Sequence, residues 1–358
     1  MKNFFLITLV RLYRCFFRRR SKDRFERFLI VSTTGLGDTL WATPALRALR
    51  YQFPSAYIAI LTSPLGSAVL KNNPYIDESF LMTDPALPSL IKLYPVLKQR
   101  MIDTVLIFHS SQRPILPFCH WLGANDIIGT ETLHKGLDCL LTKKTPHKTE
   151  HEISRRLAIV AEVGAQPQGQ TMEVFIAEKD EYSVDAFLKK KEIPSYLPMI
   201  GLHPGAKDLF KQWPPEEFIK IGKRLTEELG YQILITGNAD EELLVSKIAQ
   251  GIPRAIAICG QLTIHELAAL QKRLHLLITN DTGPMHLAAA MGTPLLALFC
   301  PTNPTLCGPI SNGKLEQIIM SPTCTPCLKK QCREPFCMLQ ISSTEVYAKA
   351  VSLLNPCL

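Results

Sequence analysis

The residues of this chain that could do chemistry begin with an acid in a glycine-rich turn. Asp38 lies in the run Ser-Thr-Thr-Gly-Leu-Gly-Asp-Thr, which follows a short apolar stretch and precedes a helical pattern. Leu40 stands where a dinucleotide fingerprint needs a small residue, and the Gly-Lys-Ser/Thr ending of a P-loop is absent. A helix start normally attracts phosphate, which a carboxylate would repel. The sequence therefore raises the question of what chemistry an acid performs at this position.

Three further polar clusters follow strand-like runs in the second half of the chain. Glycine-rich turns and helix starts offer backbone N–H groups to phosphate, lysines supply countercharge, and carboxylates accept hydrogen bonds from ribose hydroxyls. Asp240 and Glu241 could instead cap their helix, and His286 could be a buried core histidine. The donor-binding candidates are Gly37, His203, Gly205, Ala206, Lys207, Asp240, Glu241, Asp281, Thr282, Gly283, Pro284 and His286, with Lys211 as a catalytic countercharge.

A cysteine-rich segment near the C-terminus holds four of the eleven cysteines. The odd total, the lack of a signal peptide and the C-x2-C-x4-C-x4-C spacing argue against a secreted disulfide framework. Two alternatives stay open: a structural zinc or iron–sulfur site, or thiols that are unliganded or redox-active. The metal candidates are Cys324, Cys327, Cys332 and Cys337.

Alternating strand and helix patterns must position these residues. Strand-like runs at 28–32, 56–62, 103–109 and 125–129 alternate with helical stretches, and five more runs follow Pro198. This alternation predicts an α/β chain with doubly wound parallel sheets, whose ligands bind beyond the carboxyl ends of the strands. We expect an extension at 1–27, a first Rossmann-like domain at 28–185, a second at 198–322, and a cysteine-rich segment at 323–358 whose closing helix packs back across the first domain.

The positive charge of the chain is concentrated at its N-terminus. The net charge is +8, and nine cations fall in the first 27 residues, so the remainder is nearly balanced and nucleic acid is not an expected partner. The apolar run at 3–10 is too short to span a bilayer and lacks the layout of a secretory signal. The extension suits an interfacial helix on anionic lipid, with a helix packed on the protein as the alternative.

Several blocks resemble glycosyltransferase family 9, the heptosyltransferases of lipopolysaccharide core assembly, over roughly residues 28–345. They are GLGDTLWATPALRAL, LHPGAKDLFKQWPPEEF, ITGNADEE and TNDTGPMHLAAAMGTPLLALFCPTNPTLCGP. The resemblance implies a GT-B architecture, in which two Rossmann-like domains face a cleft, with the acceptor on the first and the nucleotide-sugar on the second. It implies Asp38 as general base, Lys211 on the donor diphosphate, Asp240 or Glu241 on the ribose, the block from Asp281 to His286 on the diphosphate and sugar, and His109 and Arg113 on the acceptor side.

The expected function is that of an inverting sugar transferase. The chain contains no Asp-x-Asp pair, so we expect no metal or other cofactor to be required for catalysis. The resemblance implies ADP-heptose as donor, a lipid-linked saccharide such as the lipopolysaccharide inner core as acceptor, and a peripheral location on the cytoplasmic face of the inner membrane. The alternatives are a non-catalytic protein that binds a nucleotide-sugar or polysaccharide, and a nicotinamide-dependent oxidoreductase.

Overall fold

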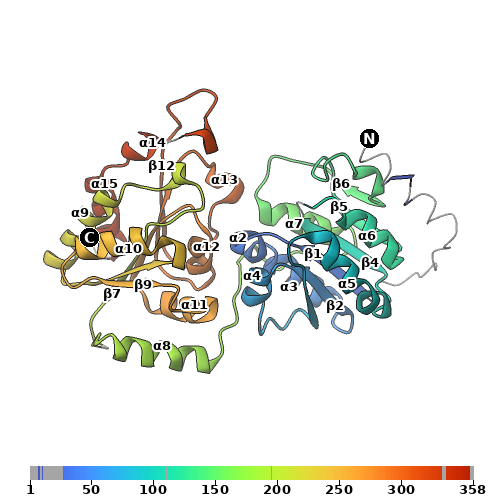
Figure 1. Cartoon of the computed structure of the whole chain (residues 1–358), viewed down its shortest axis with the longest axis horizontal. Helices are drawn as coiled ribbons and strands as arrows, with labels where there is room; N and C mark the ends of the chain where they lie inside the picture. Colours follow the sequence, from blue (N-terminus) through green and yellow to red (C-terminus); the bar gives the residue numbers. More distant parts are fainter. Residues whose placement is uncertain are drawn as a thin grey trace. The chain divides into compact units, whose positions relative to one another are not determined.

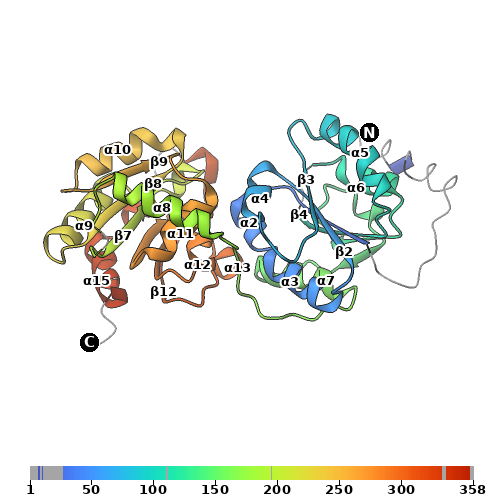
Figure 2. The same ribbon diagram turned by 90° about the horizontal axis from the view of Figure 1, so that it is seen from below.

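The chain forms two compact units, residues 1–170 and 171–358. The computed structural model describes residues 7, 8, 10, 27–109, 112–194, 196–332 and 336–354. Each unit is built on a six-stranded parallel sheet covered by helices (Figure 1, Figure 2). The predicted pair of doubly wound, Rossmann-like domains is therefore confirmed.

Unit 1 has the strand order β3-β2-β1-β4-β5-β6. Its central strands are continuous apolar runs because both faces of a parallel sheet are covered. Its strands are β1 (Arg27–Ser32), β2 (Tyr57–Thr62), β3 (Glu78–Leu81), β4 (Thr104–His109), β5 (Asp126–Thr130) and β6 (Lys143–Thr145). Its helices are α2 (Leu36–Leu40), α3 (Thr43–Gln52), α4 (Pro64–Val69), α5 (Ala86–Gln99), α6 (Ile115–Leu122) and α7 (Glu152–Ala161), with the 3-10 turn η1 (Asp138–Leu140).

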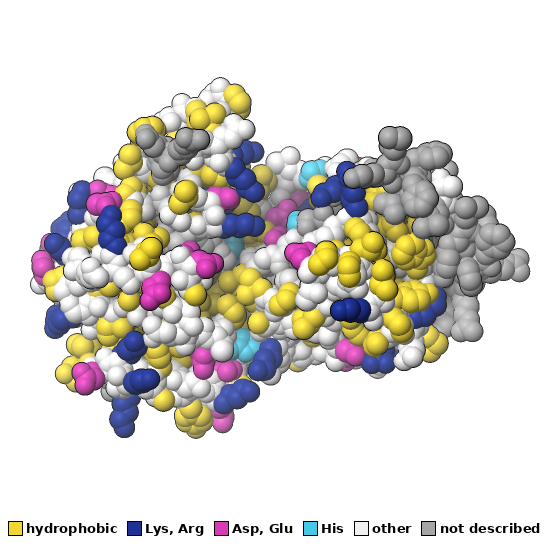
Figure 3. Space-filling view, viewed as in Figure 1, with side chains coloured by type: hydrophobic (Ala, Val, Ile, Leu, Met, Phe, Trp, Pro, Cys, Tyr) yellow, Lys and Arg dark blue, Asp and Glu magenta, His cyan; other side chains and the backbone are white. Residues whose placement is uncertain are grey.

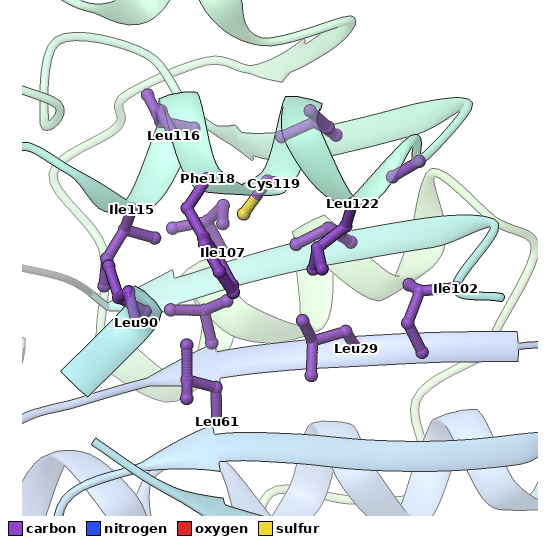
Figure 4. Close-up of a cluster of buried hydrophobic side chains, with 14 of the residues drawn as sticks. Leu29, Leu61, Leu90, Ile102, Ile107, Ile115, Leu116, Phe118, Cys119 and Leu122 are labelled. Carbon is purple, nitrogen blue, oxygen red and sulfur yellow. The ribbon is translucent and has the colours of Figure 1, made fainter. Parts of the chain in front are cut away.

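The core of unit 1 lies between the sheet and helices α5 and α6. Figure 4 shows Leu29 of β1 and Ile107 of β4 facing Ile115, Phe118 and other side chains of α6. These strand residues alternate with others that point to the opposite face, as the period of two requires. The strand order reverses between β1 and β4, so the loops that follow these two strands lie side by side at the carboxyl edge.

Unit 2 repeats the arrangement with the order β12-β11-β10-β7-β8-β9. The reversal falls between β7 and β10. Its strands are β7 (Met199–His203), β8 (Gln232–Gly237), β9 (Ile256–Cys259), β10 (Leu276–Asn280), β11 (Leu295–Phe299) and β12 (Leu315–Ile319). Its helices are α8 (Glu178–Lys190), α9 (Pro215–Glu227), α10 (Glu242–Gln250), α11 (Ile264–Arg273), α12 (Gly283–Ala290), α13 (Pro304–Cys307), α14 (Phe336–Leu339) and α15 (Ser343–Leu354), with the 3-10 turns η2 (Leu209–Lys211), η3 (Ala239–Glu241) and η4 (Lys329–Gln331).

Two helices lie with a different unit from the one that the sequence led us to expect. Helix α8, which falls inside the expected first domain at 28–185, belongs to unit 2. It packs on α11, where Glu181 pairs with Lys272 at 2.9 Å. The closing helix α15 packs on α9 and places Val346 in the core of unit 2, rather than across the first domain.

The N-terminal extension lies mostly outside the described residues. Of the part that is described, Val10 is fully buried in the core of unit 1 and Ile7 packs against that core. This burial fits the packed-helix alternative for these positions and does not test the interfacial one. Within the described residues, none of the helices has the length and apolar content to cross a membrane.

Candidate active site

The loop that carries Asp38 is held at the strand-order reversal of unit 1. The Thr33 N–H donates to the His109 carbonyl at 3.2 Å, which ties the turn after β1 to the end of β4. The Ser63 hydroxyl donates to the Thr34 carbonyl at 2.8 Å and ties the same turn to the end of β2. The short helix α2 then begins, with Asp38 in its first turn. Three strand ends therefore fix the position of the acid.

Asp38 faces a buried arginine that comes from a distant part of the sequence. The guanidinium of Arg156 lies 3.4 Å from the Asp38 carboxylate, and its side chain is 0% exposed against 25% for Asp38. The same guanidinium lies 2.6 Å from Glu152 and 5.5 Å from the centre of the Trp41 ring. Burial lowers the pKa of Arg156, and the Arg155 charge adds to this, while Glu152 and Asp38 oppose it. Asp38 is therefore partly exposed and has a buried cation beside one of its carboxylate oxygens.

Glu152 holds this arginine in place. Burial opposes its ionisation, but hydrogen bonding and charge from Arg155 and Arg156 prevail and lower the pKa of Glu152 to about 2. Arg155 in turn donates to the Phe108 carbonyl at 3.0 Å, next to the end of β4. The first turn of α7 thus forms an ionic network behind Asp38. Glu152 and Arg156 could not be recognised as part of this site from the sequence, because a charged helix start has the same pattern whether it is exposed or buried.

The two acceptor-side candidates lie at the end of β4 and in the loop after it. His109 is half-buried, and burial lowers its pKa, against the opposing influence of Asp38. Neutral imidazole is therefore its principal form near pH 7. Arg113 is exposed and lines a small pocket together with Gln112 and His134. Both candidates are in the same unit as Asp38, as is Gly37, whereas every other donor-binding candidate is in unit 2.

His203 is buried under the loops that follow β7 and β8 and is not part of the exposed surface of unit 2. It ends β7, is 5% exposed, and its Nδ1 lies 3.0 Å from the Thr236 hydroxyl on β8. Burial lowers the pKa of His203 to about 4, so it is neutral near pH 7. This side chain joins two strand ends, which supports the loops above it.

The loop after β7 is fixed by two amide side chains that are not among the candidate site residues. Asn280, at the end of β10, donates to the Pro204 carbonyl at 2.7 Å and accepts from the Trp213 N–H at 3.1 Å. Gln212 donates to the Ala206 carbonyl at 2.9 Å. These bonds hold the backbone around Ala206 and leave Lys207 exposed. A buried asparagine at a strand end was the available signal, since a buried amide needs partners.

Glu241 and Asp240 occupy different surroundings. The Glu241 carboxylate accepts from the Asn238 N–H at 2.9 Å and lies against Gly205, where an added Cβ would come within 2.0 Å of a Glu241 oxygen. Asp240 is exposed. Glycine at 205 is therefore required by the close approach of this carboxylate. The bond from the Asn238 N–H to Glu241 completes a capping box, so the capping alternative for this acid is confirmed.

The start of helix α12 carries free backbone donors beside a lysine. Thr282 is the N-cap residue but its side chain makes no capping hydrogen bond, and within the described residues its hydroxyl has no partner. The Lys211 ammonium lies 2.6 Å from the Asp281 carboxylate and balances the charge of the acid that precedes this helix start. Gly283 and Pro284 form the first turn, and His286 is 3% exposed within the helix. Unit 2 thus brings Lys211 and the block from Asp281 to His286 together.

Within the described residues, the four cysteine side chains of the C-terminal segment do not gather around one point. The Cys337 thiol accepts from the Thr323 N–H at 3.2 Å. Cys300, at the end of β11, is a further partner of Cys337, and its pKa is raised to about 12 by burial and then by the nearby Cys337, Cys327 and Cys324. In the part of the chain that is described, His, Cys, Asp and Glu side chains form no group of three or more with the geometry to hold a metal ion.

The chain is similar to known glycosyltransferases over most of its length. A family model described as glycosyltransferase family 9 (heptosyltransferase) matches residues 115–337, more than half of the chain. Lipooligosaccharide heptosyltransferase 2 of Campylobacter jejuni is 25% identical over 343 residues, which cover 90% of this chain and 96% of that protein.

Solved structures share the fold over nearly the whole chain. The glycosyl transferase family 9 protein of Veillonella parvula matches with a TM-score of 0.84 and 23% identity, covering 93% of this chain and 98% of that one. ADP-heptose lipopolysaccharide heptosyltransferase II of Escherichia coli matches with a TM-score of 0.76 and 21% identity, covering 92% and 98%. An iron-containing dodecameric glycosyltransferase of enterotoxigenic E. coli matches with a TM-score of 0.56 and 14% identity, covering 93% and 77%. The fold class is GT-B.

Proposed function

The chain belongs to glycosyltransferase family 9 and is a glycosyltransferase, and from that premise we propose that it moves a heptosyl group from ADP-heptose to a lipid-linked saccharide such as the lipopolysaccharide inner core. The observation that carries the chemistry is the position of Asp38, which is partly exposed and paired with the buried Arg156. A non-catalytic sugar-binding protein would need neither this acid nor the network that fixes it.

We propose that Asp38 activates the acceptor. A sugar hydroxyl is a poor nucleophile near pH 7, and a carboxylate within hydrogen-bond reach takes its proton as the new bond forms to the anomeric carbon. Attack from the face opposite the departing diphosphate inverts the configuration at that carbon. His109 ends β4, which pairs with the β1 strand that precedes the Asp38 turn, and Arg113 lies in the loop after β4; we assign both side chains to acceptor binding.

We assign donor binding to unit 2. The free N–H groups at the start of α12 and the Lys211 ammonium are placed to stabilise the diphosphate, both when the donor binds and when the diphosphate leaves. Glu241, rather than the exposed Asp240, is assigned to the ribose hydroxyls because its carboxylate lies against Gly205. Since lysine and backbone donors supply the positive charge, we expect catalysis without a divalent cation.

The cysteine segment is proposed to bind one structural zinc or iron ion. Its support is the presence of four thiols within a short segment and of Cys300 beside them. Thiolates are the ligands that zinc and iron prefer in structural sites. Binding requires the thiols to draw closer than they stand in this structure. Metal analysis of the purified chain and of a Cys324→Ser/Cys327→Ser variant tests this: one equivalent of metal, lost in the variant, supports it, and a metal-free parent contradicts it.

The experiment that tests the main proposal is a transfer assay with several nucleotide-sugars. ADP-heptose and UDP-sugars are offered with lipopolysaccharide core acceptors that lack successive heptoses, and the product is followed by mass spectrometry. A mass gain of one heptose, only with ADP-heptose, supports the proposal. Transfer of another sugar would refute the donor assignment, and donor binding without transfer to any core acceptor would refute the acceptor assignment. The peripheral location at the inner membrane is part of the same proposal.

A further inference from the structure

A tryptophan side chain lies beside the acid of unit 1. Trp41 ends the short helix α2, where its backbone N–H donates to the Gly37 carbonyl at 2.9 Å. Residues three positions apart in helical backbone lie on the same face, so Trp41 and Asp38 share one face of this turn. Proton transfer to Asp38 does not require an indole, so the position of Trp41 needs another explanation.

The guanidinium of Arg156 touches both of these side chains. Its Cζ atom lies over the Trp41 ring, 5.5 Å from the ring centre, and one of its nitrogens lies 3.4 Å from the Asp38 carboxylate. The face of an aromatic ring is electron-rich and attracts a cation in this position. The His151 ring, at the start of α7, meets the same indole in a T-shaped contact with 6.4 Å between the ring centres. Two contacts from α7 therefore hold the indole next to the acid.

Trp41 is exposed where its neighbour is not. The Arg156 side chain is 0% exposed, whereas Trp41 is partly exposed. Because the guanidinium covers one face of the indole, the exposed part of the ring is directed away from Arg156. Ligand-binding surfaces typically combine such aromatic side chains with a few well-placed polar groups. The pair of Trp41 and Asp38 has this composition.

The chemistry of a sugar ring complements an aromatic ring next to a carboxylate. One side of a pyranose presents C–H groups, which pack against the electron-rich face of an aromatic side chain. The hydroxyls project from the rim of the sugar and stay free for hydrogen bonds. A sugar stacked on Trp41 would therefore carry a hydroxyl towards the carboxylate on the same face of the turn.

We propose that Trp41 binds one sugar ring of the acceptor by stacking, and that this contact directs a hydroxyl of that ring to Asp38. Trp41 is then an acceptor-binding residue that selects a saccharide over an alcohol without a ring. This inference rests on the proposed function, because it names a residue that recognises the acceptor of that reaction. Donor binding is assigned to unit 2 and does not depend on Trp41.

The other tryptophans of the chain serve as controls. The chain contains three, of which Trp213 is 1% exposed in the core of unit 2. Trp121 of α6 is partly exposed, as Trp41 is, but it lines an apolar groove of about 350 Å³ between α5 and α6. Figure 3 shows hydrophobic side chains gathered over these two helices. None of the described residues that line this groove belongs to the network around Asp38, so Trp121 is the matched control.

Tryptophan fluorescence tests the contact without donor and without lipid. Core oligosaccharides freed of their lipid, and lacking successive heptoses, are titrated into the wild type, Trp41→Phe and Trp121→Phe, and quenching by acrylamide is measured with and without oligosaccharide. We expect the oligosaccharide to protect part of the emission from acrylamide in the wild type and in Trp121→Phe. This protection should be absent in Trp41→Phe, although calorimetry should show that the Phe variant still binds the oligosaccharide through its smaller ring.

Transfer kinetics test whether the contact contributes to acceptor recognition. Trp41→Leu should raise the KM for the acceptor about tenfold, the cost of losing one aromatic contact, and leave the KM for the donor unchanged. Trp41→Phe should recover most of this loss because it keeps an aromatic face. Trp121→Leu makes the same chemical change outside the site and should leave both KM values unchanged. Circular dichroism shows whether each variant is folded, and Trp41→Phe alone decides the contact if Trp41→Leu is not.

Three kinetic outcomes would overturn the proposal. They are an unchanged acceptor KM in Trp41→Leu, an equal rise in Trp121→Leu, or a fall in kcat alone, which would show that the ring acts only by holding Arg156. Fluorescence separates this proposal from the proposed function. Transfer of heptose by a wild type whose Trp41 is not protected would refute the stacking contact only. Protection of Trp41 without transfer would refute the proposed function only, and the absence of both would refute both.

Discussion

The buried guanidinium of Arg156 lies 3.4 Å from the carboxylate of Asp38, and the two residues are 118 positions apart in the sequence. One partner lies in the first turn after β1 and the other in α7, so the fold of unit 1 creates the pair. The arginine contacts one oxygen of the carboxylate, and the Asp38 side chain is 25% exposed. This geometry is the basis of the first three predictions.

Replacing Asp38 with Asn should abolish most of the turnover and leave donor binding intact. The amide keeps the size of the side chain but cannot take the proton of the acceptor hydroxyl. Loss of a general base lowers the rate by roughly 10²–10⁴, which is about 3–5 kcal/mol of barrier. Calorimetric titration with ADP-heptose and single-turnover transfer measure the two effects separately. An Asn variant with near wild-type turnover would remove Asp38 from the mechanism.

Two replacements of Arg156 should separate its contribution to the stability of unit 1 from its role in positioning the Asp38 carboxylate. Arg156→Met removes one member of a buried ionic network and should lower the free energy of unfolding by about 3 kcal/mol or more. Arg156→Lys keeps the charge, but one ammonium cannot contact Asp38 and Glu152 with the geometry of the guanidinium fork. We expect it to fold, to keep the KM for donor, and to lose about tenfold or more in kcat. A Lys variant with unchanged kcat would show that the arginine serves stability alone.

Glu152 should make the stability of unit 1 depend on pH in acid. Its pKa is lowered from 4.5 to about 2 in the folded chain. A lowered carboxyl pKa stabilises the folded state above the unfolded-state pKa, and this contribution is lost as the pH falls through the folded-state pKa. The melting temperature of the wild type should therefore exceed that of Glu152→Gln near pH 6, and the gap should close between about pH 4.5 and 2. The stabilisation at stake is about 3 kcal/mol. A gap independent of pH would contradict the ionic role.

The strands were predictable from the sequence, because they depend on local signals. Apolar runs bounded by Gly, Pro and Asn mark strands, and the carboxyl-end rule then places Asp38, the pair Asp240 and Glu241, and the turn at Gly283 directly after strand ends, where a ligand is expected. Asp281 illustrates what local reasoning leaves open. A carboxylate beside a diphosphate is electrostatically unfavourable, and the sequence does not show that the Lys211 ammonium lies 2.6 Å from the Asp281 carboxylate.

The partners of the helices were not predictable, because amphipathic periodicity reveals that a face is buried but not what buries it. Helix α8 packs in unit 2 through Glu181 and Lys272, although it directly follows the last elements of unit 1 in the sequence. Helix α15 likewise packs on α9. The network of Glu152 and Arg156 belongs to the same class, since charged residues in a first turn usually face water.

Glu241 and Asp240 should differ in their effect on nucleotide binding. Glu241→Gln should raise the Kd for ADP by roughly 10–100-fold, the cost of weakening hydrogen bonds to a charged group. Asp240→Asn is the matched control, because it makes the same chemical change one residue away on an exposed side chain, and it should leave the Kd nearly unchanged. Binding of inorganic pyrophosphate should be alike in all three proteins, since it lacks a ribose. Equal effects of the two substitutions would refute the assignment.

Turnover should persist in the presence of a chelator, because Lys211 and the backbone N–H groups at the start of α12 supply the positive charge that the leaving diphosphate needs. By the same argument Lys211→Met should lower kcat by about 10²–10³, the usual effect of losing one donor to a developing anion. Initial rates are measured after treatment with EDTA, with and without added magnesium or manganese, and circular dichroism confirms that the chelator does not unfold the chain through its cysteine segment. A strict loss of activity that magnesium restores would show that the diphosphate is held through a metal ion and that Lys211 acts beside it.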